Sequence, residues 1–433
     1  MTMLTTTLLA SFFASLPLAA AFSDSANNNV AIYWGQNSLG QDGSQQNLAY
    51  YCNDDASDVV LVSFLNQFFA EGGLPSINLG PSCGGTTFAG TNLLSCPDVG
   101  KDIATCQGKG KKILLSLGGA SGAYGFTSAD QAKDFANTLW NLFAGGSSDT
   151  RPFGDVKVDG FDLDIEGGSN QYYNDFVDQM RQNYASDASK KYYISGAPQC
   201  PIPDQMLNPA MTTSDFDMYF VQFYNNYCGL QSYGTDNFNF AAWDNFAKTQ
   251  SSNPNAKVYL GVPGGPTAAG SGYVDADQVI KIANDLQSKY SSFGGVSIWD
   301  ASQAWANHDF ADVVKAGLES SQADPQPSLA LSTTDQNKNV VPSTSAQAPA
   351  SSSAPASANG PASSSAPASA NGPASSSAPA SANGPAASST PASANSPAAS
   401  STPAPADPTV TVRPTVTLTK FFPLASCGCV ANN

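Results

Sequence analysis

The feature that most restricts the fold of this chain is a series of eight short apolar runs separated by longer stretches with helical spacing. Short runs rich in β-branched and aromatic residues are typical of buried strands. Strands that alternate with helices form parallel sheets. Eight such repeats predict an α/β fold, a single (β/α)8 barrel. The predicted strands are Val30–Trp34, Val59–Leu65, Lys112–Leu117, Gly160–Glu166, Tyr192–Ala197, Met218–Tyr224, Val258–Val262 and Val296–Trp299.

Two of the intervening stretches have clear helical spacing. Apolar residues recur every three or four positions in Ala129–Phe143 and in Asp275–Tyr290. Residues at this spacing lie on one face of a helix. We therefore expect helices over both stretches, packed on the outside of the barrel.

The fourth predicted strand contains several acids. Side chains alternate along a strand, so Asp162, Asp164 and Glu166 share one face. A solvent-facing strand would show the same alternation, but it would normally intersperse basic residues, and none occurs between Lys157 and Arg181. Acids that line a confined site repel one another, so at least one stays protonated near neutral pH. A protonated carboxyl beside an ionised one is what glycoside hydrolysis requires.

The unusual residues fall where a barrel places its active site, at the carboxyl ends of the strands. Gln36 follows the first predicted strand, and Gly119 follows the third. Glu166, Tyr224 and Trp299 lie at the ends of the fourth, sixth and eighth strands. This placement favours acids that point into the barrel.

Residues 159–166 have the pattern D-x-x-D-x-D-x-E, which resembles the active-site motif of the family 18 glycoside hydrolases, the chitinase family. Other segments resemble the plant and fungal class III branch of that family, in the family's order, from about Val30 to about Val314. These segments are Tyr33–Asn37, Ser116–Gly119, Gln222–Asn226, Ala268–Tyr273 and Ile298–Trp299. The resemblance implies the same barrel fold and glycosidase activity.

The resemblance implies catalytic roles for four residues. Glu166 would be the general acid that protonates the leaving glycosidic oxygen. Asp164 would orient the substrate's N-acetyl group and stabilise the charge that develops on it, and Asp162 would tune Asp164 by sharing a proton with it. Tyr224 would donate a hydrogen bond to the acetamido oxygen. Members of this family use that oxygen as the nucleophile, so the anomeric configuration is retained.

The resemblance also implies substrate contacts around these four residues. Trp299 would be the flat apolar surface on which the distorted sugar stacks. Asp159 belongs to the motif, but its side chain is expected on the opposite face of the strand from the other three acids. We therefore expect a structural role for it at the start of the strand. The other expected contacts are Gln222, Tyr33, Gln36, Asn66, Asn78, Gly119 and Ala197.

These observations predict a secreted endo-chitinase that cleaves β-1,4 bonds between N-acetylglucosamine units in chitin or chitin oligosaccharides. An endo-β-N-acetylglucosaminidase acting on N-glycan cores would use the same acetamido chemistry, and the sequence leaves the shape of the cleft open. A non-catalytic lectin, or an inhibitor of other hydrolases, would need no general acid, so the complete set of acids argues against it. A structural protein of the cell wall, attached through its stalk, would have no enzymatic activity or would not need it for its function.

Charge and histidine content argue against other classes of protein. The net charge of −16 disfavours nucleic-acid binding, because contacts with phosphates need a basic face. The single histidine, His308, cannot form a His-rich zinc site, and a surface or capping role is expected for it. We expect no metal and no cofactor.

The eight cysteines follow an apolar N-terminal segment, so disulfides are the expected state. Six of them lie in the body of the chain and allow fifteen pairings. The family resemblance implies the pairs Cys52–Cys106, Cys83–Cys96 and Cys200–Cys228. Cys427 and Cys429 could bridge to each other or to another molecule.

The two ends of the chain differ from the barrel in composition. Residues 1–21 are expected to be a secretory signal peptide, because an apolar run there ends in three alanines, and no later run is long enough to cross a bilayer. The barrel is expected over residues 22–323. Residues 324–408 are expected to be a disordered, O-glycosylated stalk of Ser/Pro/Ala-rich twelve-residue repeats, and residues 409–433 a short C-terminal segment. We expect a monomer that associates with the cell wall through this tail.

Overall fold

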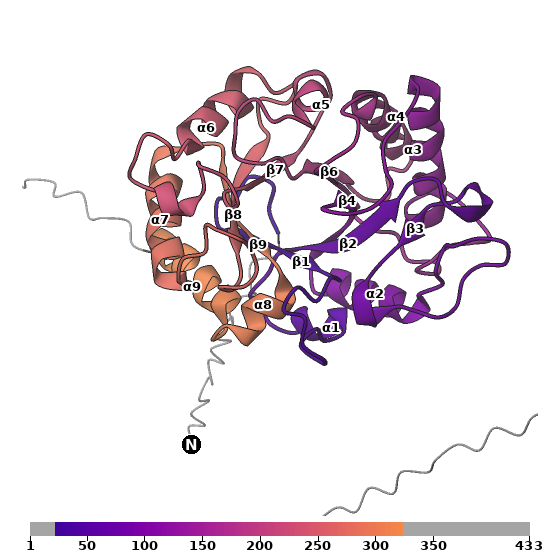
Figure 1. Ribbon diagram of the computed structural model, residues 1–433, viewed down its shortest axis with the longest axis horizontal. Coiled ribbons are helices and arrows are strands. Elements are labelled where there is room, and N and C mark those ends of the chain that lie inside the picture. The colour runs from indigo at the N-terminus through magenta and orange to yellow at the C-terminus, as the bar shows by residue number, and fades with distance from the viewer. Residues whose placement is uncertain (1–21, 324–433) are drawn as a thin grey trace, which may run out of the picture. The chain divides into compact units, whose positions relative to one another are not determined.

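The computed structural model describes residues 22–323, which fold into a closed barrel of eight parallel strands surrounded by helices (Figure 1). The order around the barrel is β1, β2, β4, β5, β6, β7, β8, β9. The barrel closes because β1 pairs with both β2 and β9. The strands are β1 (Asn29–Trp34), β2 (Val59–Gln67), β4 (Lys112–Gly119), β5 (Gly160–Ile165), β6 (Tyr193–Gly196), β7 (Met218–Gln222), β8 (Lys257–Pro263) and β9 (Phe293–Trp299).

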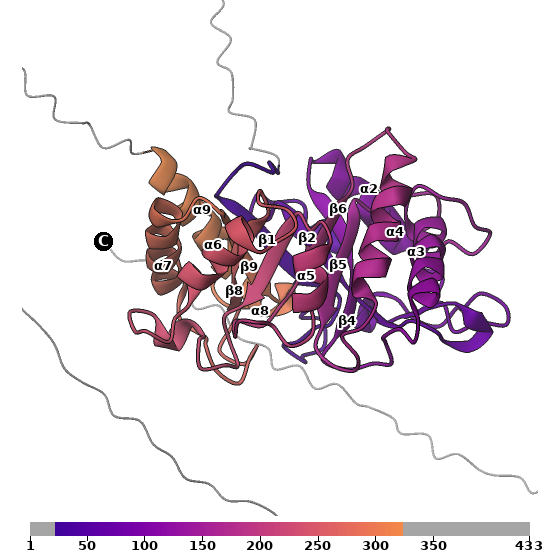
Figure 2. The same cartoon turned by 90° about the horizontal axis from the view of Figure 1, so that it is seen from above.

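All eight predicted strands are confirmed, with ends that match the prediction or differ from it by up to three residues. Helices pack outside them, and Figure 2 shows the strands between α7 and α9 on one side and α3 and α4 on the other. The α-helices are α1 (Leu48–Tyr51), α2 (Pro97–Gly108), α3 (Ala129–Phe143), α4 (Tyr173–Ala185), α5 (Asn208–Thr213), α6 (Phe240–Thr249), α7 (Ala276–Lys289), α8 (Ala301–Ala306) and α9 (Phe310–Ala323). Three short 3-10 helices are η1 (Glu71–Gly73), η2 (Gly80–Ser82) and η3 (Leu230–Ser232).

The N-terminal ends of α3 and α7 are set by capping side chains. Helix α3 has the predicted bounds, and the Ser128 hydroxyl accepts a hydrogen bond from the Gln131 N–H at 3.1 Å. Helix α7 is one residue shorter at each end than predicted. Asp275 caps it from outside, since its carboxylate accepts from the Gln278 N–H at 2.8 Å. Both caps satisfy donors that the first turn of a helix leaves free.

The apolar runs do not predict β3 (Ser76–Ile77), which pairs antiparallel with β2. Two residues are too few to produce an alternation in the sequence. After β3 the chain returns to the mouth of the barrel, where the backbone groups of Phe64 and Asn78 exchange two hydrogen bonds of 2.8 Å. This short strand therefore brings Asn78 beside the carboxyl ends of β1 and β2.

The two faces of the barrel strands pack differently. The outward faces pack against the helices in the larger core, which contains Phe161 and Leu163 of β5. Inward apolar residues such as Leu114 and Phe220 form a smaller cluster in the interior. On β5 the inward residues are acids, and the Asp162 side chain is fully buried there. The predicted inward orientation of the acids is confirmed.

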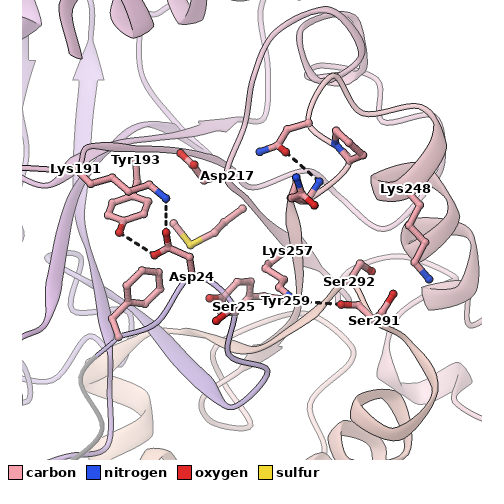
Figure 3. A pocket seen from close by; sticks show the side chains of 16 residues that line it. Asp24, Ser25, Lys191, Tyr193, Asp217, Lys248, Lys257, Tyr259, Ser291 and Ser292 are labelled. Atoms are coloured by element: carbon pink, nitrogen blue, oxygen red, sulfur yellow. Dashed lines mark hydrogen bonds and ion pairs between the residues drawn. The ribbon is translucent and has the colours of Figure 1, made fainter. Parts of the chain in front are cut away.

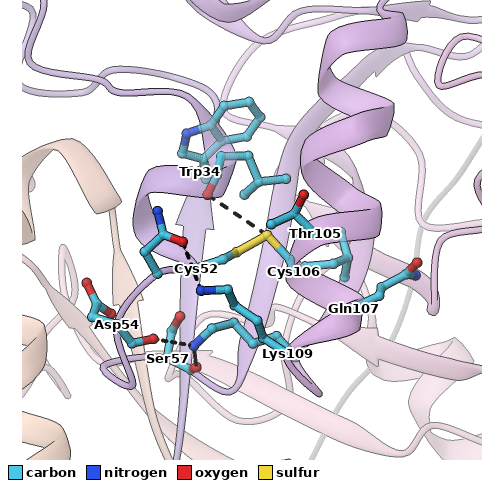
Figure 4. Close-up of a disulfide and its surroundings, with 12 residues drawn as sticks. Trp34, Cys52, Asp54, Ser57, Thr105, Cys106, Gln107 and Lys109 are labelled. Carbon is cyan, nitrogen blue, oxygen red and sulfur yellow. Dashed lines mark hydrogen bonds between the residues drawn. A yellow bond between two sulfur atoms is a disulfide. The ribbon is translucent and has the colours of Figure 1, made fainter.

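The three disulfides implied by the family resemblance are present, with Cα–Cα distances of 5.3, 5.8 and 5.9 Å. Cys52–Cys106 joins the end of α1 to α2, close to Trp34 (Figure 4). Cys83–Cys96 links the segment after η2 to the start of α2. Cys200–Cys228 joins the segments that follow β6 and β7 at the mouth of the barrel.

Several expectations concern residues outside the described range. These are the signal peptide (1–21), the stalk (324–408) and the C-terminal segment (409–433), with Cys427 and Cys429. Among residues 22–323, no helix combines the length and the apolar character that crossing a membrane would require.

A buried ion pair joins the last helix to the start of the barrel. Lys315 Nζ on α9 lies 2.8 Å from Asp58 Oδ2, and both side chains are less than a tenth exposed. The same oxygen accepts from the Val30 N–H at 2.7 Å, and Lys315 also donates to the Asn28 carbonyl oxygen at 3.2 Å. The pair thus connects α9, β1 and β2 where the barrel closes.

We expect Lys315→Met to lower the free energy of unfolding by about 3–5 kcal/mol, because it leaves the Asp58 carboxylate buried without a cation. Lys101→Met is the matched control. Lys101 pairs with Asp98 at 2.7 Å, but these side chains are 76% and 89% exposed, so we expect no measurable change. Chemical denaturation measures both variants, and equal losses would show that the buried pair has no special role.

We expect removal of Cys52–Cys106 to destabilise the barrel more than removal of Cys83–Cys96. The two bridges span sequence separations of 54 and 13 residues. In the chain-entropy model the longer loop contributes about 1 kcal/mol more. Double alanine variants of each pair, compared by denaturant unfolding, test this order. A larger loss for the shorter loop would contradict the model.

Candidate active site

Asp162 is fully buried and accepts hydrogen bonds from three hydroxyl groups. Ser116 on β4 and Ser195 on β6 each donate to one of its oxygens at 2.7 Å, and Tyr33 on β1 donates at 3.4 Å. Burial raises the pKa of Asp162 to about 6, although the three hydroxyls oppose the shift. Side chains from three strands therefore hold this carboxyl group in one orientation.

Asp164 and Glu166 meet at the side-chain amide of Gln222 on β7. Gln222 Nε2 lies within hydrogen-bond distance of Asp164 Oδ1 at 3.0 Å and of Glu166 Oε1 at 3.4 Å. It also donates to the Ala197 carbonyl oxygen at 3.1 Å. Asp164 is buried, whereas Glu166 is half-buried at the end of β5. Gln222 therefore fixes the two carboxyl groups relative to each other.

The protonation of Asp164 depends on that of Glu166. Burial, followed by the charges of Glu166 and Asp162, raises the pKa of Asp164 well above its usual range, and Asp164 hydrogen-bonds to Glu166. Burial also raises the pKa of Glu166, while hydrogen bonds from Gln222 and Asp164 act against that shift. Two ionised carboxylates at this spacing would repel, so the pair retains a proton at pH values where ordinary carboxyl groups have lost theirs. Asp162 acts on this pair through its charge.

A cavity of about 270 Å³ opens at the carboxyl ends of the strands, beside these acids. Its walls come from the ends of β1, β2, β4, β5, β7 and β9 and from the segments after β3, β7 and β8. The lining residues are Gln36, Phe64, Asn66, Asn78, Ala120, Ser121, Asp164, Glu166, Gln222, Tyr224, Asn225, Ala268 and Trp299. Aromatic rings with a few converging polar groups are typical of a site for a small polar ligand.

Eight of the twelve predicted catalytic and substrate-contact residues line this cavity. The other four are Asp162, Tyr33, Gly119 and Ala197, which do not line it. Asp162 and Tyr33 bind each other, and Ala197 binds Gln222 through its carbonyl oxygen. These residues therefore support the lining side chains from behind. Within residues 22–323, no group of three or more His, Cys, Asp or Glu side chains is arranged to hold a metal ion.

Aromatic rings hold Trp299 at the edge of the cavity. Its ring stacks on Phe64 with centroids 5.8 Å apart and planes 23° apart, and Tyr33 packs edge-on at 5.5 Å. Gly119 makes room for this cluster, because its φ is +85° and a Cβ there would lie 2.8 Å from the Phe64 ring. The sequence does not single out Phe64, which lies in an ordinary apolar strand pattern.

Tyr224 and Asn225 form the wall after β7. Tyr224 is 9% exposed, and burial, together with the neighbouring carboxylates, raises the pKa of its phenol well above the usual range. The phenol therefore stays neutral and can donate a hydrogen bond. Asn225 Oδ1 accepts from the N–H groups of Gly270 and Ser271 at 2.8 and 3.2 Å. This contact between two loops has no local sequence pattern, and Asn225 was not among the predicted site residues.

Gln36 and Asn78 line the cavity, but the protein itself uses part of their amides. Gln36 Nε2 donates to the carbonyl oxygens of Ser63 and Asn78 at 2.8 and 2.9 Å. Asn78 Oδ1 accepts from the Gly80 N–H at 2.9 Å. These bonds leave Gln36 Oε1 and Asn78 Nδ2 for a ligand.

Asp159 lies at the opposite end of β5 from Glu166. Its Oδ2 accepts from the Ile113 N–H and from Gln107 Nε2, both at 2.8 Å, and its Oδ1 pairs with Lys190 at 2.7 Å. These contacts join α2, β4 and the segment before β6. These contacts agree with the structural role predicted for Asp159 from its position on the opposite face of the strand.

A larger cavity of about 570 Å³ lies at the other end of the barrel, where β6, β7 and β8 begin (Figure 3). Asp24 there pairs with Lys191 and accepts from the Tyr193 hydroxyl at 2.9 Å. Lys257 donates to the Ser291 carbonyl oxygen at 3.0 Å. None of the predicted site residues lines this cavity, so the smaller one beside the acids is the candidate active site.

The chain is similar to known proteins over its barrel. The model of the glycosyl hydrolases family 18 matches residues 29–284. A curated relative, Chitinase 2 of Rhizopus oligosporus, is 53% identical over 302 residues, which are 70% of this chain and 54% of that protein. The chain thus spans about half the length of that relative.

Two solved structures share the fold at substantial identity. The chitinase ICChI from Ipomoea carnea is 33% identical with a TM-score of 0.57, over 67% of this chain and 99% of that one. The xylanase and α-amylase inhibitor protein XAIP-II from Scadoxus multiflorus is 29% identical with a TM-score of 0.56, over 66% and 98%. Fold alone therefore does not determine function.

The family model covers residues 29–284, which are 256 of the 433 residues and thus more than half of the chain. The chain therefore belongs to the glycosyl hydrolases family 18.

Proposed function

We propose that this chain is an endo-acting chitinase that hydrolyses β-1,4 bonds between N-acetylglucosamine units. The observation that carries the proposal is the pair of Asp164 and Glu166, which the Gln222 amide joins beside a sugar-sized cavity. Burial raises the pKa of both carboxyl groups, which favours a retained proton. The names of the Rhizopus relative and of the Ipomoea structure support chitin as the substrate.

Glu166 would donate its proton to the glycosidic oxygen as the bond from that oxygen to the anomeric carbon breaks. The substrate's acetamido oxygen would form a bond to the same carbon and give an oxazolinium ion. Glu166, now ionised, would take a proton from a water molecule that attacks the anomeric carbon. The acetamido group is then released, and the product keeps the original configuration.

The hydrogen bond between Asp164 and Glu166 suggests how the acid acquires its proton. An acetamido N–H that binds Asp164 would favour its ionised form, and the shared proton would then move from Asp164 to Glu166. The ionised Asp164 would also stabilise the positive charge of the oxazolinium ion. Asp162, held by its three hydroxyls, would keep Asp164 in place and tune it through its charge.

The cavity walls suit the sugar at the cleaved bond. The Trp299 ring, backed by Phe64, would stack on the apolar face of the pyranose. The neutral Tyr224 hydroxyl would donate to the acetamido oxygen and aim it at the anomeric carbon. The amides of Gln36, Asn66 and Asn78 line the same cavity and would bind sugar hydroxyls.

A binding protein without catalysis is the second candidate, because XAIP-II, named as an inhibitor, shares the fold. Such a protein would not require two adjoining carboxyl groups with raised pKa values at the cavity, and Asp164 and Glu166 form such a pair in this chain. An endo-β-N-acetylglucosaminidase acting on N-glycan cores would use the same residues, so only its substrate distinguishes it.

We further propose that the protein is secreted and acts as a monomer outside the cell or at the cell wall. Three disulfides in the barrel support an oxidising compartment. The composition of residues 1–21 suits a signal peptide, and that of residues 324–408 suits an O-glycosylated stalk, which would associate with the cell wall.

We expect Glu166→Gln to lower kcat on chitin oligomers by roughly 10²–10⁴-fold, because the amide cannot act as general acid. Glu71→Gln, in the exposed η1 segment, is the matched control and should leave kcat unchanged. A chitobiose-core glycopeptide is assayed in parallel. Cleavage of the glycopeptide alone would reassign the substrate, and binding of oligomers without any cleavage would favour the binding protein.

We expect Gln222→Met to move the alkaline limb of the kcat/KM profile to higher pH. Activity falls as pH rises through the pKa of the acid, and the hydrogen bond from Gln222 lowers the pKa of Glu166. Loss of that donor therefore keeps Glu166 protonated to higher pH. Gln179→Met, which removes a contact with Asn183 on α4, should leave the profile unchanged. A shift to lower pH would contradict the assignment.

A further inference from the structure

The cavity beside the acids is small for a polymeric substrate. Its volume of about 270 Å³ falls below the range of roughly 300–1,000 Å³ typical of pockets that enclose a drug-sized ligand. A chain of several sugars must therefore extend beyond the cavity and lie on the surface around it. Residues just outside the lining, at the rim of the barrel mouth, are where such contacts should be sought.

Tyr227 is an exposed residue of the loop that follows β7. Among the described residues, four large apolar side chains are strongly exposed, and Tyr227 is the most exposed of them at 60%. It follows the cavity-lining Asn225 by two positions, so their Cα atoms are at most about 7 Å apart. The loop after β7 thus extends from the cavity wall directly to an exposed aromatic ring.

The backbone that carries Tyr227 is fixed on both sides. The next residue, Cys228, is bonded to Cys200. On the other side, the Asn226 amide donates to Gln199 Oε1 at 3.1 Å. The Ser232 hydroxyl also binds the Tyr227 carbonyl oxygen at 2.6 Å. A ring on such a loop can bind a ligand with little loss of backbone entropy.

The Tyr227 ring differs from the other exposed aromatic rings. Phe69 packs against Phe135 at 5.2 Å, and Tyr50 packs edge-on against Tyr51 at 5.3 Å. Tyr227 makes no ring contact with another aromatic side chain of residues 22–323. An aromatic face that no other ring covers, on a loop that also lines a polar cavity, suits a ligand that has both an apolar face and hydroxyl groups.

We propose that Tyr227 is a stacking surface for a sugar unit bound just outside the cavity, on the side of the barrel formed by the loop after β7. This inference rests on the proposed chitinase function and adds a binding position to it. The apolar C–H face of a β-linked pyranose would lie on the ring, and the phenol would reach its polar substituents. Tyr227 would therefore favour long oligomers over short ones and take no part in bond cleavage.

The test compares kcat/KM for chitin oligomers of three and six units. Tyr227→Ala should lower the value for the hexamer by about 3- to 10-fold, with a smaller loss or none for the trimer. Tyr227→Trp should preserve the preference for the hexamer. Tyr50→Ala removes a tyrosine that is 49% exposed and does not line the cavity, and it should change neither value.

Two results would overturn the stacking surface while the chitinase function stands. One is that Tyr227→Ala lowers kcat/KM equally for the trimer and the hexamer. The other is that its kcat/KM for the hexamer equals that of Tyr50→Ala. If the unsubstituted chain cleaves no oligomer, the proposed function is wrong. The stacking surface is then judged by hexamer binding to Glu166→Gln, measured by calorimetry. Tyr227→Ala in that background must weaken hexamer binding more than trimer binding, and otherwise the inference fails.

Discussion

The burial of carboxyl groups on the inward face of β5 is the constraint on which the rest of the site depends. A buried carboxyl group needs hydrogen-bond donors, and here they come from four other strands, β1, β4, β6 and β7. The donors observed on Asp162 and Asp164 are hydroxyls and an amide, without lysine or arginine. Neutral donors satisfy the carboxyl oxygens but do not fully offset the effect of burial on the charged form, so the pKa values of Asp162 and Asp164 stay raised. The barrel interior thus favours the protonated form that the proposed general acid requires.

The same constraint accounts for the composition of β4, the neighbour of β5. Ser116 donates to Asp162, and two residues later Gly118 pairs with Asp164 in the sheet. A Cβ at Gly118 would lie 2.3 Å from the Asp164 carbonyl oxygen, so this position requires glycine. Gly119 leaves room for Phe64, which in turn supports Trp299. One short segment therefore positions an acid, the strand that carries it and the aromatic ring across the barrel.

Sequence alone predicts what depends on local periodicity. The eight strands, both helices and the inward direction of the acids follow from alternation and spacing, and the strands and the acids are where the pattern places them. Contacts between distant segments leave no such trace, so Phe64 and Asn225 were not predicted as site residues, and β3 was missed because two residues show no alternation. The same limit applies to side chains with several possible partners. Gln36 was expected to contact the substrate, but its amide nitrogen is already bound to Ser63 and Asn78. Gly119 and Ala197 lie behind the residues that line the cavity and do not line it themselves. A sequence pattern does not show how far a residue lies from the cavity surface.

The closure of the barrel has a consequence for how the protein is made. Strand β1 leaves the ribosome before the other strands of the barrel, yet its second partner, β9, ends at Trp299, and the cation that pairs with Asp58 is Lys315. Until both emerge, β1 presents an unpaired edge and Asp58 lacks its counter-ion. Unpaired edges invite association with other chains during synthesis. Strand β1 therefore stays open to such pairing until β9 has been translated, and a truncation before α9 removes the ion pair with Asp58.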